Sequence, residues 1–527
     1  MPGYPARVTS PFGPGGLPEQ QTVPTRPQHP AAIRVQALVA ALGDAVGLYG
    51  TGDVAVTGVS LSSQRVVGGD LYAALPGSRA HGADYVADAL AAGAIAVLTD
   101  PAGLTRMRSA GEPAVPVLVT EHPRRVLGAL AVAVYGNPAA SMRMVGVTGT
   151  QGKTTTTRLA EAALLEAGVR AAVVGTLGTR IAGREVKTAL TTPEAPDLHG
   201  LFARMREESV VACAMEVSSH ALVMGRVDGV VFDVAVFLNL GRDHLDFHRD
   251  LEDYFQAKAS LFTPTRARLG LVNVDDEHGR RLAREAVIPI RTLSTRGPAD
   301  WSAADMRLGP DGSDFTLRGP GGIELRVRCP LPGDYNVANS LAALAAIGEA
   351  GLPRGTLEAA AAALAQGASV PGRLERIDEG QDFTLVVDYA HKPDAVEAAL
   401  HTLRPLTEGR VIVVLGAGGD RDPGKRPIMG RIAAQLADVL IVTDDNPRTE
   451  DPAAIRAAVL AGASGQTAEV VEIGDRRAAI AEAVGRAAAG DIVLVAGKGH
   501  ETGQEIGGVV HPFDDREVAR ELLRGAG

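Results

Sequence analysis

Cysteine, long apolar runs and clusters of basic charge are all scarce in this chain of 527 residues, and each scarcity excludes a class of protein. Two cysteines, Cys213 and Cys329, are too few for a disulfide scaffold or a cysteine-rich zinc site, and they fit a reducing compartment. No uncharged apolar run of membrane-spanning length occurs, so we expect no membrane span. No secretory signal is visible either, so we expect a cytoplasmic protein.

Positive charge is also unusual here, both in amount and in kind. The net charge is −10 and no Lys/Arg cluster stands out, which argues against nucleic acid as a partner. Because lysine is a compact point charge, unlike arginine, we expect the rare lysines to mark positions where arginine does not serve. Only six of the 52 basic residues are lysines, namely Lys153, Lys187, Lys258, Lys392, Lys425 and Lys498.

Apolar runs and turns divide the chain into a tail and three α/β blocks. Residues 1–33 are rich in proline and poor in apolar side chains, so we expect a disordered tail. Residues 34–140 alternate short strands with alanine-rich helices and predict a small N-terminal α/β domain. Longer βα units in 141–370 predict a P-loop-type central domain with a mostly parallel sheet. The same pattern in 371–527 predicts a Rossmann-like α/β domain.

The polar motifs follow predicted strands, and ligands of open α/β sheets bind at the carboxyl ends of strands. This placement favours a functional role for the motifs. The strands that we expect in the second and third blocks are Met144–Val147, Ala171–Val174, Val211–Met215, Val234–Leu238, Leu269–Val272, Thr384–Val387, Val411–Leu415, Val439–Val442 and Ile492–Val495.

A glycine-rich turn follows the first of these strands and leads into a predicted helix. Such a turn points backbone N–H groups at an anion, while its lysine reaches terminal phosphates and its threonine binds Mg²⁺. The usual spacing is not fully met, because Val147 stands six residues before Lys153. We still predict a nucleoside triphosphate site formed by Gly149, Thr150, Gln151, Gly152, Lys153, Thr154 and Thr155.

Lys258 fills a place on the apolar stripe of a predicted helix over 251–262. A lysine there either extends its amine to water or forms part of a site. A neutral amine at such a site can add CO₂ and become a carbamate, an anion that binds Mg²⁺. Glu216 and His244, which follow two predicted strands, are further candidate ligands, although each is also consistent with a solvated side chain.

Together the motifs resemble the Mur ligases, a family that includes folylpolyglutamate synthases as distant relatives. The resemblance covers about residues 50–520. Two further segments, Asp445–Arg448 and Gly497–Glu501, resemble motifs of the family members that bind diaminopimelate. The other matching segments are Gly149–Thr155, Glu216–His220, Asn239–His244, the Lys258 helix, Gly333–Asn336, Pro371–Arg373 and Asp388–His391.

The resemblance implies an ATP-dependent amide ligase that acts through an acyl phosphate, so that its work is charge neutralisation and positioning. It implies ATP contacts from the glycine-rich loop, from Asn336 or Asn339, and from Asp388 or His391. Lys153, Lys258, His244 and Arg373 would be the catalytic residues. One Mg²⁺ would be held by Thr154 and Glu216, and a second by His244 and the carbamate of Lys258.

The resemblance also assigns the other substrates to parts of the chain. UDP-MurNAc-L-Ala-D-Glu would bind the N-terminal domain and Ser63, Thr191, Thr192, Ser218 and Arg226. Residues 371–527 would bind meso-diaminopimelate, whose distal carboxylate, absent from lysine, suits the fork of an arginine. The residues implied for this amino acid are Arg421, Asp445, Asn446, Pro447, Arg448, Gly497 and Glu501.

Several readings stay open beside a diaminopimelate ligase of peptidoglycan precursor synthesis. The same chemistry with L-lysine or glutamate as the acceptor is one, and a non-catalytic nucleotide-binding relative is another. The sequence departs from the family pattern at Gln151, Ser62, Gln64, Met224 and Lys392. We expect a monomer that acts on small molecules.

Overall fold

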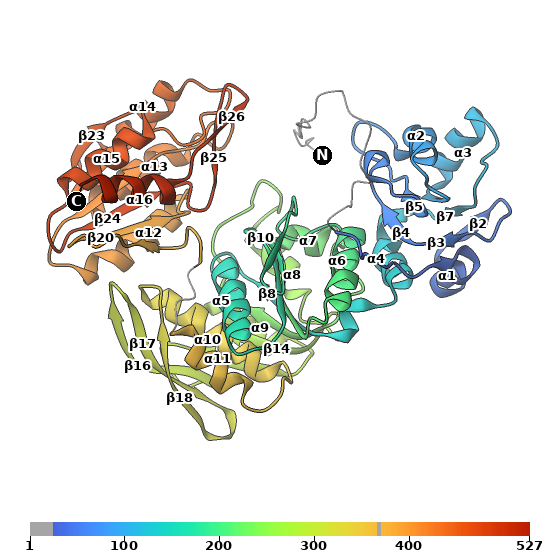
Figure 1. Cartoon of the computed structure of the whole chain (residues 1–527), viewed down its shortest axis with the longest axis horizontal. Helices are drawn as coiled ribbons and strands as arrows, with labels where there is room; N and C mark the ends of the chain where they lie inside the picture. The colour runs from blue at the N-terminus through green and yellow to red at the C-terminus, as the bar shows by residue number, and fades with distance from the viewer. Residues whose placement is uncertain (1–24, 366–369, 527) are drawn as a thin grey trace. The chain divides into compact units, whose positions relative to one another are not determined.

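The computed structural model describes residues 25–365 and 370–526, which fold as two compact units (Figure 1). The first unit contains the described residues up to Gln151, together with Gly168–Arg291 and Glu349–Leu352. The second contains Gly152–Ala167, Thr292–Gly348 and the described residues from Pro353 onward. Both units are built on parallel strands with helices between them, so the predicted α/β class is confirmed.

A five-stranded sheet in the first unit has the order β2-β7-β6-β5-β4, and only β2 is antiparallel to its neighbour. Helices α1 and α4 pack on one face of the sheet, and α2 and α3 on the other. The bounds are α1 Val35–Leu42, β2 Gly47–Tyr49, β4 Gly58–Ser60, β5 Asp70–Ala73, α2 Val86–Ala91, β6 Ala96–Thr99, α3 Pro101–Ala110, β7 Val117–Val119 and α4 Pro123–Tyr135.

The second sheet of this unit has the order β11-β10-β9-β12-β8-β13-β14. Its five strands from β9 to β14 are parallel, so the loops after β8, β12 and β13 leave the same edge. The bounds are β8 Arg143–Thr148, β9 Ala171–Gly175, β10 Gly178–Ile181, β11 Arg184–Val186, α6 Ala195–Glu207, β12 Ala212–Glu216, α7 Ser219–Val223, β13 Phe232–Phe237, α8 Leu251–Ala259, β14 Ala267–Asn273 and α9 Glu277–Glu285.

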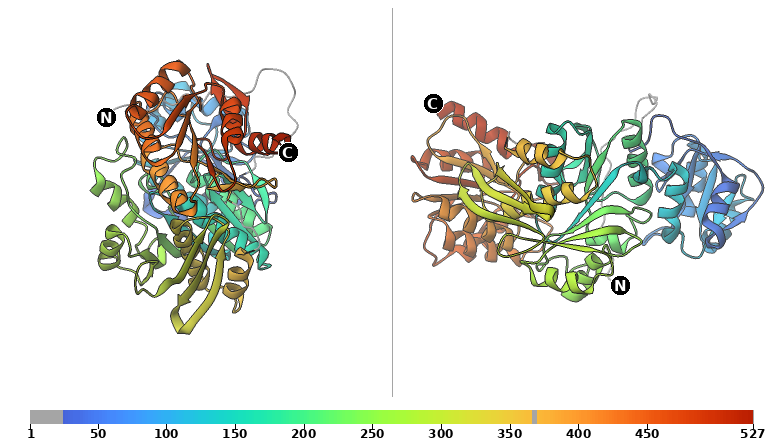
Figure 2. Two further views of the ribbon diagram at one scale, coloured as in Figure 1. Left: turned by 90° about the vertical axis from the view of Figure 1, so that its left-hand side faces the viewer. Right: turned by 90° about the horizontal axis from the view of Figure 1, so that it is seen from below.

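A doubly wound sheet forms the carboxyl-terminal part of the second unit (Figure 2), with the order β19-β20-β24-β21-β22-β23. Helices α12, α13 and α14 cover one face, and α15 and α16 cover the other. The bounds are β19 Glu375–Ile377, β20 Thr384–Asp388, α12 Pro393–Leu403, β21 Val411–Leu415, α13 Lys425–Leu436, β22 Val439–Val442, α14 Pro452–Ala463, β23 Glu469–Glu472, α15 Arg476–Arg486, β24 Ile492–Ala496 and α16 Asp515–Ala526.

The rest of the second unit includes elements that the sequence did not reveal. Three antiparallel strands, β16 Trp301–Gly309, β17 Gly312–Gly319 and β18 Ile323–Cys329, follow one another as hairpins. A further hairpin joins β25 Gly503–Ile506 to β26 Val509–Pro512.

The remaining helices of the second unit are α5 Lys153–Glu166, α10 Asp334–Glu349 and α11 Thr356–Leu364, and α11 packs against α5.

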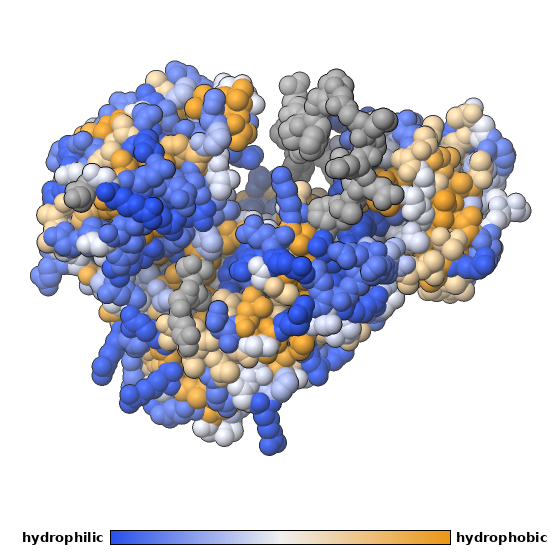
Figure 3. Space-filling model, in the orientation of Figure 1, coloured by the Kyte–Doolittle hydropathy of each residue, from blue (hydrophilic) through white to orange (hydrophobic). Residues whose placement is uncertain are grey.

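The face drawn in Figure 3 is largely hydrophilic, with apolar residues in scattered patches. Over residues 25–365 and 370–526, none of the helices combines the length and hydropathy that a bilayer span requires.

The predicted disordered tail, 1–33, lies largely outside the described residues, but its last part is fixed to the protein. Arg26 donates to Asp70 Oδ2 at 2.8 Å and to the Val59 carbonyl at 2.6 Å. Thr25 is buried and its hydroxyl donates to Asp197 at 3.0 Å. The expectation of disorder is therefore wrong for this segment, because a proline-rich composition does not reveal that one arginine has a buried carboxylate partner far along the chain.

A buried ion pair fastens the two helices on one face of the doubly wound sheet. Arg476, which begins α15, donates to Asp515 of α16 through Nε and Nη2, each at 2.7 Å, and both side chains are fully buried. Arg476 also donates to the carbonyls of Ala496 at 2.9 Å and Asp444 at 3.4 Å. The pair thereby connects α16 to the ends of β22 and β24.

Replacing Arg476 should be far more damaging than replacing its neighbour Arg477. Arg476→Met leaves the buried charge of Asp515 uncompensated, and we expect a loss of about 3–5 kcal/mol of unfolding free energy. Arg477→Met is the matched control, since Arg477 pairs with Glu521 at 2.8 Å between half-exposed side chains. That change should cost less than about 1 kcal/mol. Denaturant unfolding followed by fluorescence measures both, and equal losses would contradict the assignment.

Candidate functional site

The loop 149–151 after β8 is held by the loop that follows β13. Asn239 accepts hydrogen bonds from the backbone N–H groups of Thr150 at 3.1 Å and Gln151 at 2.9 Å. Its amide returns a bond to the Gln151 carbonyl at 3.3 Å. These two N–H groups, which we expected to face a phosphate, therefore bond to Asn239 in this structure. Gly152, with φ of 86°, then opens α5 in a conformation that favours glycine.

Lys258 of α8 contacts the same loop. Its side chain is 1% exposed, its Nζ donates to the Gly149 carbonyl at 2.8 Å, and it lies 4.5 Å from the centre of the Tyr254 ring. The Tyr254 hydroxyl in turn bonds to Thr150 Oγ1 at 3.2 Å. This burial rules out the interpretation that Lys258 extends its amine to water. A carbamate retains one N–H, so it is compatible with the bond to Gly149.

Glu216 ends β12 and is a buried carboxylate held by neutral donors. Thr176 donates to it twice, from its backbone N–H at 2.8 Å and from its hydroxyl at 3.1 Å. A Cβ at Gly175 would lie 2.3 Å from Glu216 Oε1, so a side chain there would displace the carboxylate. In the described chain, Glu216 forms no ion pair with a lysine, arginine or histidine. Sequence reasoning missed Thr176, for which no local signal existed.

His244 lies among aromatic side chains at the same sheet edge. The His244 ring is 4.9 Å from the ring of His220, and its Nε2 is 3.4 Å from Asp243 Oδ2. His220 in turn stacks on Phe247 at 4.0 Å. Burial lowers the pKa of His220. Across the residues that the structure describes, no three His, Cys, Asp or Glu side chains gather closely enough to hold a metal ion. The Mg²⁺ ligands stay a prediction.

The residues that we expected to bind the UDP-linked substrate form a connected set near Glu216, with one exception. Thr191 bonds to Thr176 at 3.1 Å, and the buried Thr192 donates to the Glu216 carbonyl at 2.8 Å. Ser218 caps the N-terminus of α7 and accepts a bond from Ala221 N at 3.2 Å. Arg226 pairs with Glu194 at 2.9 Å and reaches the Thr192 carbonyl at 3.4 Å. The exception, Ser63, lies in the 3₁₀ turn Ser63–Arg65 beside the five-stranded sheet.

In the second unit, two asparagines brace the first turns of α5, the helix that begins with Lys153, Thr154 and Thr155. Thr156 donates to Asn339 at 3.3 Å, and Asn339 donates to Asn336 at 3.1 Å. Asn336 donates to the Pro332 carbonyl at 2.8 Å. Both asparagines are buried, and these amide groups are already engaged within the protein.

Asp388 ends β20 and His391 follows it, and Arg373 lies close to this segment. The Arg373 guanidinium is 4.9 Å from the centre of the Tyr389 ring. Asp388 accepts a bond from the Leu374 N–H at 2.7 Å, and burial raises its pKa. Burial also lowers the pKa of His391 to about 4, so its ring is neutral at pH 7 and Nδ1 donates to the Tyr389 carbonyl at 2.8 Å.

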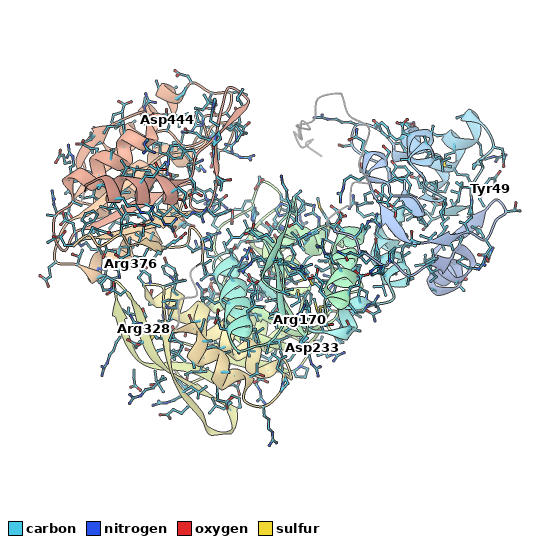
Figure 4. All side chains as sticks on the ribbon, viewed as in Figure 1. Tyr49, Arg170, Asp233, Arg328, Arg376 and Asp444 are labelled. Atoms are coloured by element: carbon cyan, nitrogen blue, oxygen red, sulfur yellow. The ribbon has the colours of Figure 1, made fainter. Side chains whose placement is uncertain are left out.

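The predicted amino-acid pocket lies where β21, β22 and β24 end, at adjacent positions in one sheet. Asp444, labelled in Figure 4, precedes the segment Asp445–Arg448. Asn446 in this segment donates to Glu501 Oε2 at 2.7 Å, which joins the loop after β22 to the loop after β24. Gly497, with φ of 118°, would place a Cβ 2.8 Å from Asp445. Arg421, in the loop after β21, is exposed.

Arg448 is fixed by its backbone as well as by its side chain. Its φ of 54° is rare for a residue with a side chain, and its N–H and carbonyl bond to Glu505 at 2.9 Å and Gly507 at 2.7 Å. Its Nη1 donates to the Gly419 carbonyl at 2.7 Å, and its Nε lies 3.3 Å from Glu505 Oε2. Sequence reasoning did not assign Glu505 or the buried Lys498 to this pocket, although the rarity of lysine was a signal for the latter.

Known proteins are similar to this chain in both sequence and fold. Three family models match: Mur ligase family, catalytic domain (55–135), Mur ligase middle domain (147–347) and Mur ligase, glutamate ligase domain (372–499). A Streptomyces coelicolor protein named UDP-N-acetylmuramoyl-L-alanyl-D-glutamate–2,6-diaminopimelate ligase is 53% identical over 95% of this chain and 99% of its own. A Leifsonia xyli protein named UDP-N-acetylmuramyl-tripeptide synthetase is 45% identical over 95% of this chain and 98% of its own.

A solved structure titled as a UDP-N-acetylmuramoyl-L-alanyl-D-glutamate–2,6-diaminopimelate ligase has a TM-score of 0.65 and 35% identity. The alignment covers 90% of this chain and 95% of the other. The models and this structure span the three blocks that the sequence predicts, so the three-domain α/β architecture is confirmed. The chain belongs to the Mur ligase family.

Proposed function

We propose that this protein is the ATP-dependent ligase that joins meso-diaminopimelate to the D-glutamate carboxylate of UDP-MurNAc-L-Ala-D-Glu. The step belongs to cytoplasmic peptidoglycan precursor synthesis, and the protein acts as a monomer. The observation that carries the proposal is Arg448, which its backbone and side chain fix in the segment Asp445–Arg448, while Asn446 of the same segment bonds to Glu501. The names of relatives at 53% and 50% identity support the same substrate.

The amide forms in two steps, because a carboxylate is a poor electrophile at neutral pH. The γ-phosphoryl of ATP passes to the D-glutamate carboxylate, and ADP leaves. The amine of diaminopimelate then attacks the acyl phosphate, inorganic phosphate leaves, and the amine loses its proton. Lys153 and Arg373 supply positive charge for the phosphoryl oxygens, while the glycine-rich loop orients them.

Glu216 fits a role as a Mg²⁺ ligand. It is 1% exposed and is held by Thr176 alone among the contacts described above, and a buried carboxylate without a cation is costly. Thr154 offers a second hard oxygen, and His244 and a carbamate on Lys258 would hold a second ion. Bound Mg²⁺ would neutralise phosphate charge. Thr176 holds the Glu216 carboxylate in one orientation.

Selection of the amino acid follows from the chemistry of its distal end. Diaminopimelate carries a distal carboxylate that the Arg448 fork accepts, whereas L-lysine offers the guanidinium no carboxylate at that end. Asp445 and Glu501 supply the negative charge that the amino groups of the substrate need. Ligation of L-lysine or glutamate, and a non-catalytic role, are the alternatives. The name of the Leifsonia xyli relative specifies no amino acid, so experiment must decide.

ADP release from purified protein, ATP, Mg²⁺ and UDP-MurNAc-L-Ala-D-Glu tests the proposal directly. Meso-diaminopimelate, L-lysine and L-glutamate are supplied separately, and we expect release with diaminopimelate alone. Release with lysine instead would retain the ligase and discard the role of Arg448. No release with any of the three would favour a non-catalytic protein.

Arg448→Ala should impair the use of diaminopimelate. Loss of a charged hydrogen bond removes about 1.5–3 kcal/mol, which is roughly a 10- to 150-fold fall in kcat/KM for this amino acid. Arg477→Ala, at a half-exposed position on α15, is the control and should leave kcat/KM unchanged. Steady-state ADP release at varied diaminopimelate measures both. An unchanged KM and kcat in Arg448→Ala would refute the assignment.

Lys258→Ala should abolish ligation, because it removes the amine that forms the carbamate. High bicarbonate should not restore the activity, whereas short carboxylic acids are candidates for partial rescue by replacing the missing anion. Lys187→Ala, at an exposed position in the same unit, is the matched control. A near wild-type rate for Lys258→Ala in the same ADP assay would eliminate the carbamate role.

A further inference from the structure

Lys498 is a fully buried lysine among the residues that we expect to bind the amino acid. It lies in the loop after β24, and its Nζ donates to Asn446 Oδ1 at 3.1 Å and to Glu501 Oε2 at 3.2 Å. A third acceptor, Asp445 Oδ1, lies 3.6 Å away. An ammonium group has three protons, and here three acceptors from two loops surround it.

These bonds fix which way the Asn446 amide points. Asn446 Oδ1 accepts from Lys498 and also from the Glu505 N–H at 2.9 Å, so its oxygen faces two donors. The NH₂ group is thereby directed to Glu501 Oε2 at 2.7 Å. Glu501 Oε2 receives bonds from both side chains, while Glu501 Oε1 takes no part in either. The carboxylate therefore has one oxygen tied to the protein and the other outside these bonds.

Lys498 also balances the charge of its neighbours. Asp445 and Glu501 contribute two negative charges, and Lys498 offsets one of them. Without the lysine, two carboxylates and an amide oxygen would face one another in a buried place, which is unfavourable.

We propose that Lys498 is the positioning residue of the amino-acid pocket: it orients Asn446 and Glu501 to receive an amino group of the substrate. The inference rests on the proposed function, which places these two residues at diaminopimelate. Lys498 itself is buried beneath them and acts through them.

Arginine would not serve at this position. The guanidinium is planar and larger than an ammonium, and its five donors form a fixed fork instead of three tetrahedral directions. Lys498 has no exposed surface through which a longer side chain could extend. The retention of a lysine here, in a chain where six of 52 basic residues are lysines, agrees with this requirement.

Lys498→Met and Lys498→Arg test the role by separating the substrates. We expect the KM for diaminopimelate to rise at least tenfold in both, while the KM values for ATP and UDP-MurNAc-L-Ala-D-Glu stay within twofold. Arg410→Met is the control for lost stability. Arg410 pairs with the largely buried Asp491 at 2.8 Å, and the two residues precede β21 and β24, at the end of the sheet away from Lys498. This variant should lower the Tm and leave all three KM values unchanged.

A double-mutant cycle distinguishes positioning from a general structural role. If Lys498 acts through Glu501, then Lys498→Met should add less than a threefold increase in KM once Glu501→Gln is present. Lys498→Gln, which keeps a donor and loses the charge, provides a second variant if Lys498→Met does not fold. Full additivity in the cycle, or an unchanged KM in any folded Lys498 variant, would overturn the inference.

The two proposals fail in different ways. A wild-type protein that releases no ADP with diaminopimelate refutes the proposed function, and the inference falls with it. A wild-type protein that is active with diaminopimelate, beside folded Lys498 variants with wild-type KM, refutes the role of Lys498 alone.

Discussion

Burying an amine or a guanidinium group is costly unless its N–H groups find acceptors, and both units of this protein organise the ends of their strands around such groups. Lys258 bonds to the carbonyl of the glycine-rich loop in the first unit. In the second, Arg476 bonds to Asp515 and to carbonyls at the ends of β22 and β24, and Lys498 bonds to Asn446 and Glu501 in the loops that follow these strands. Each of these groups holds together segments that are distant in sequence.

The opposite case occurs at Glu216, a buried anion to which the described residues bring no cationic side chain. Thr176 holds both oxygens of this carboxylate, and Thr191 and Thr192 bond to the same small network. A protein with a net charge of −10 that handles anionic substrates has to concentrate attraction locally. Under the proposed function, Mg²⁺ and a few directed donors would provide that attraction.

The sequence predicted the buried parallel strands well, because continuous apolar runs between turns are typical of them. Val411–Leu415 and Val439–Val442 coincide with β21 and β22. It did not reveal β16 to β18, where exposed charged residues alternate with apolar ones along antiparallel strands. Asn446 and Glu501 were predicted from the family resemblance, and the structure brings them together because the parallel strands β22 and β24 end at one edge of the sheet.

Supporting residues were harder to find, since their partners lie far along the chain. Thr176 contacts Glu216 across 40 positions, and Arg26 contacts Asp70 across 44. Neither belongs to a motif, and neither has a local pattern that differs from an ordinary loop. Lys498 lies inside a recognised segment, but nothing in one sequence indicates that its side chain points inward to Asn446 instead of outward to a ligand.

The way in which Arg448 is held has a consequence for the evolution of acceptor choice. Its backbone is paired with Glu505 and Gly507 of the hairpin formed by β25 and β26, so this short ribbon sets the position of the guanidinium. A change in the length of the hairpin would shift the guanidinium without altering a single residue of Asp445–Arg448. Under the proposed role of Arg448, the choice of amino acid would therefore depend on this hairpin as well as on Asp445–Arg448, and a transfer of specificity to another scaffold would need both segments.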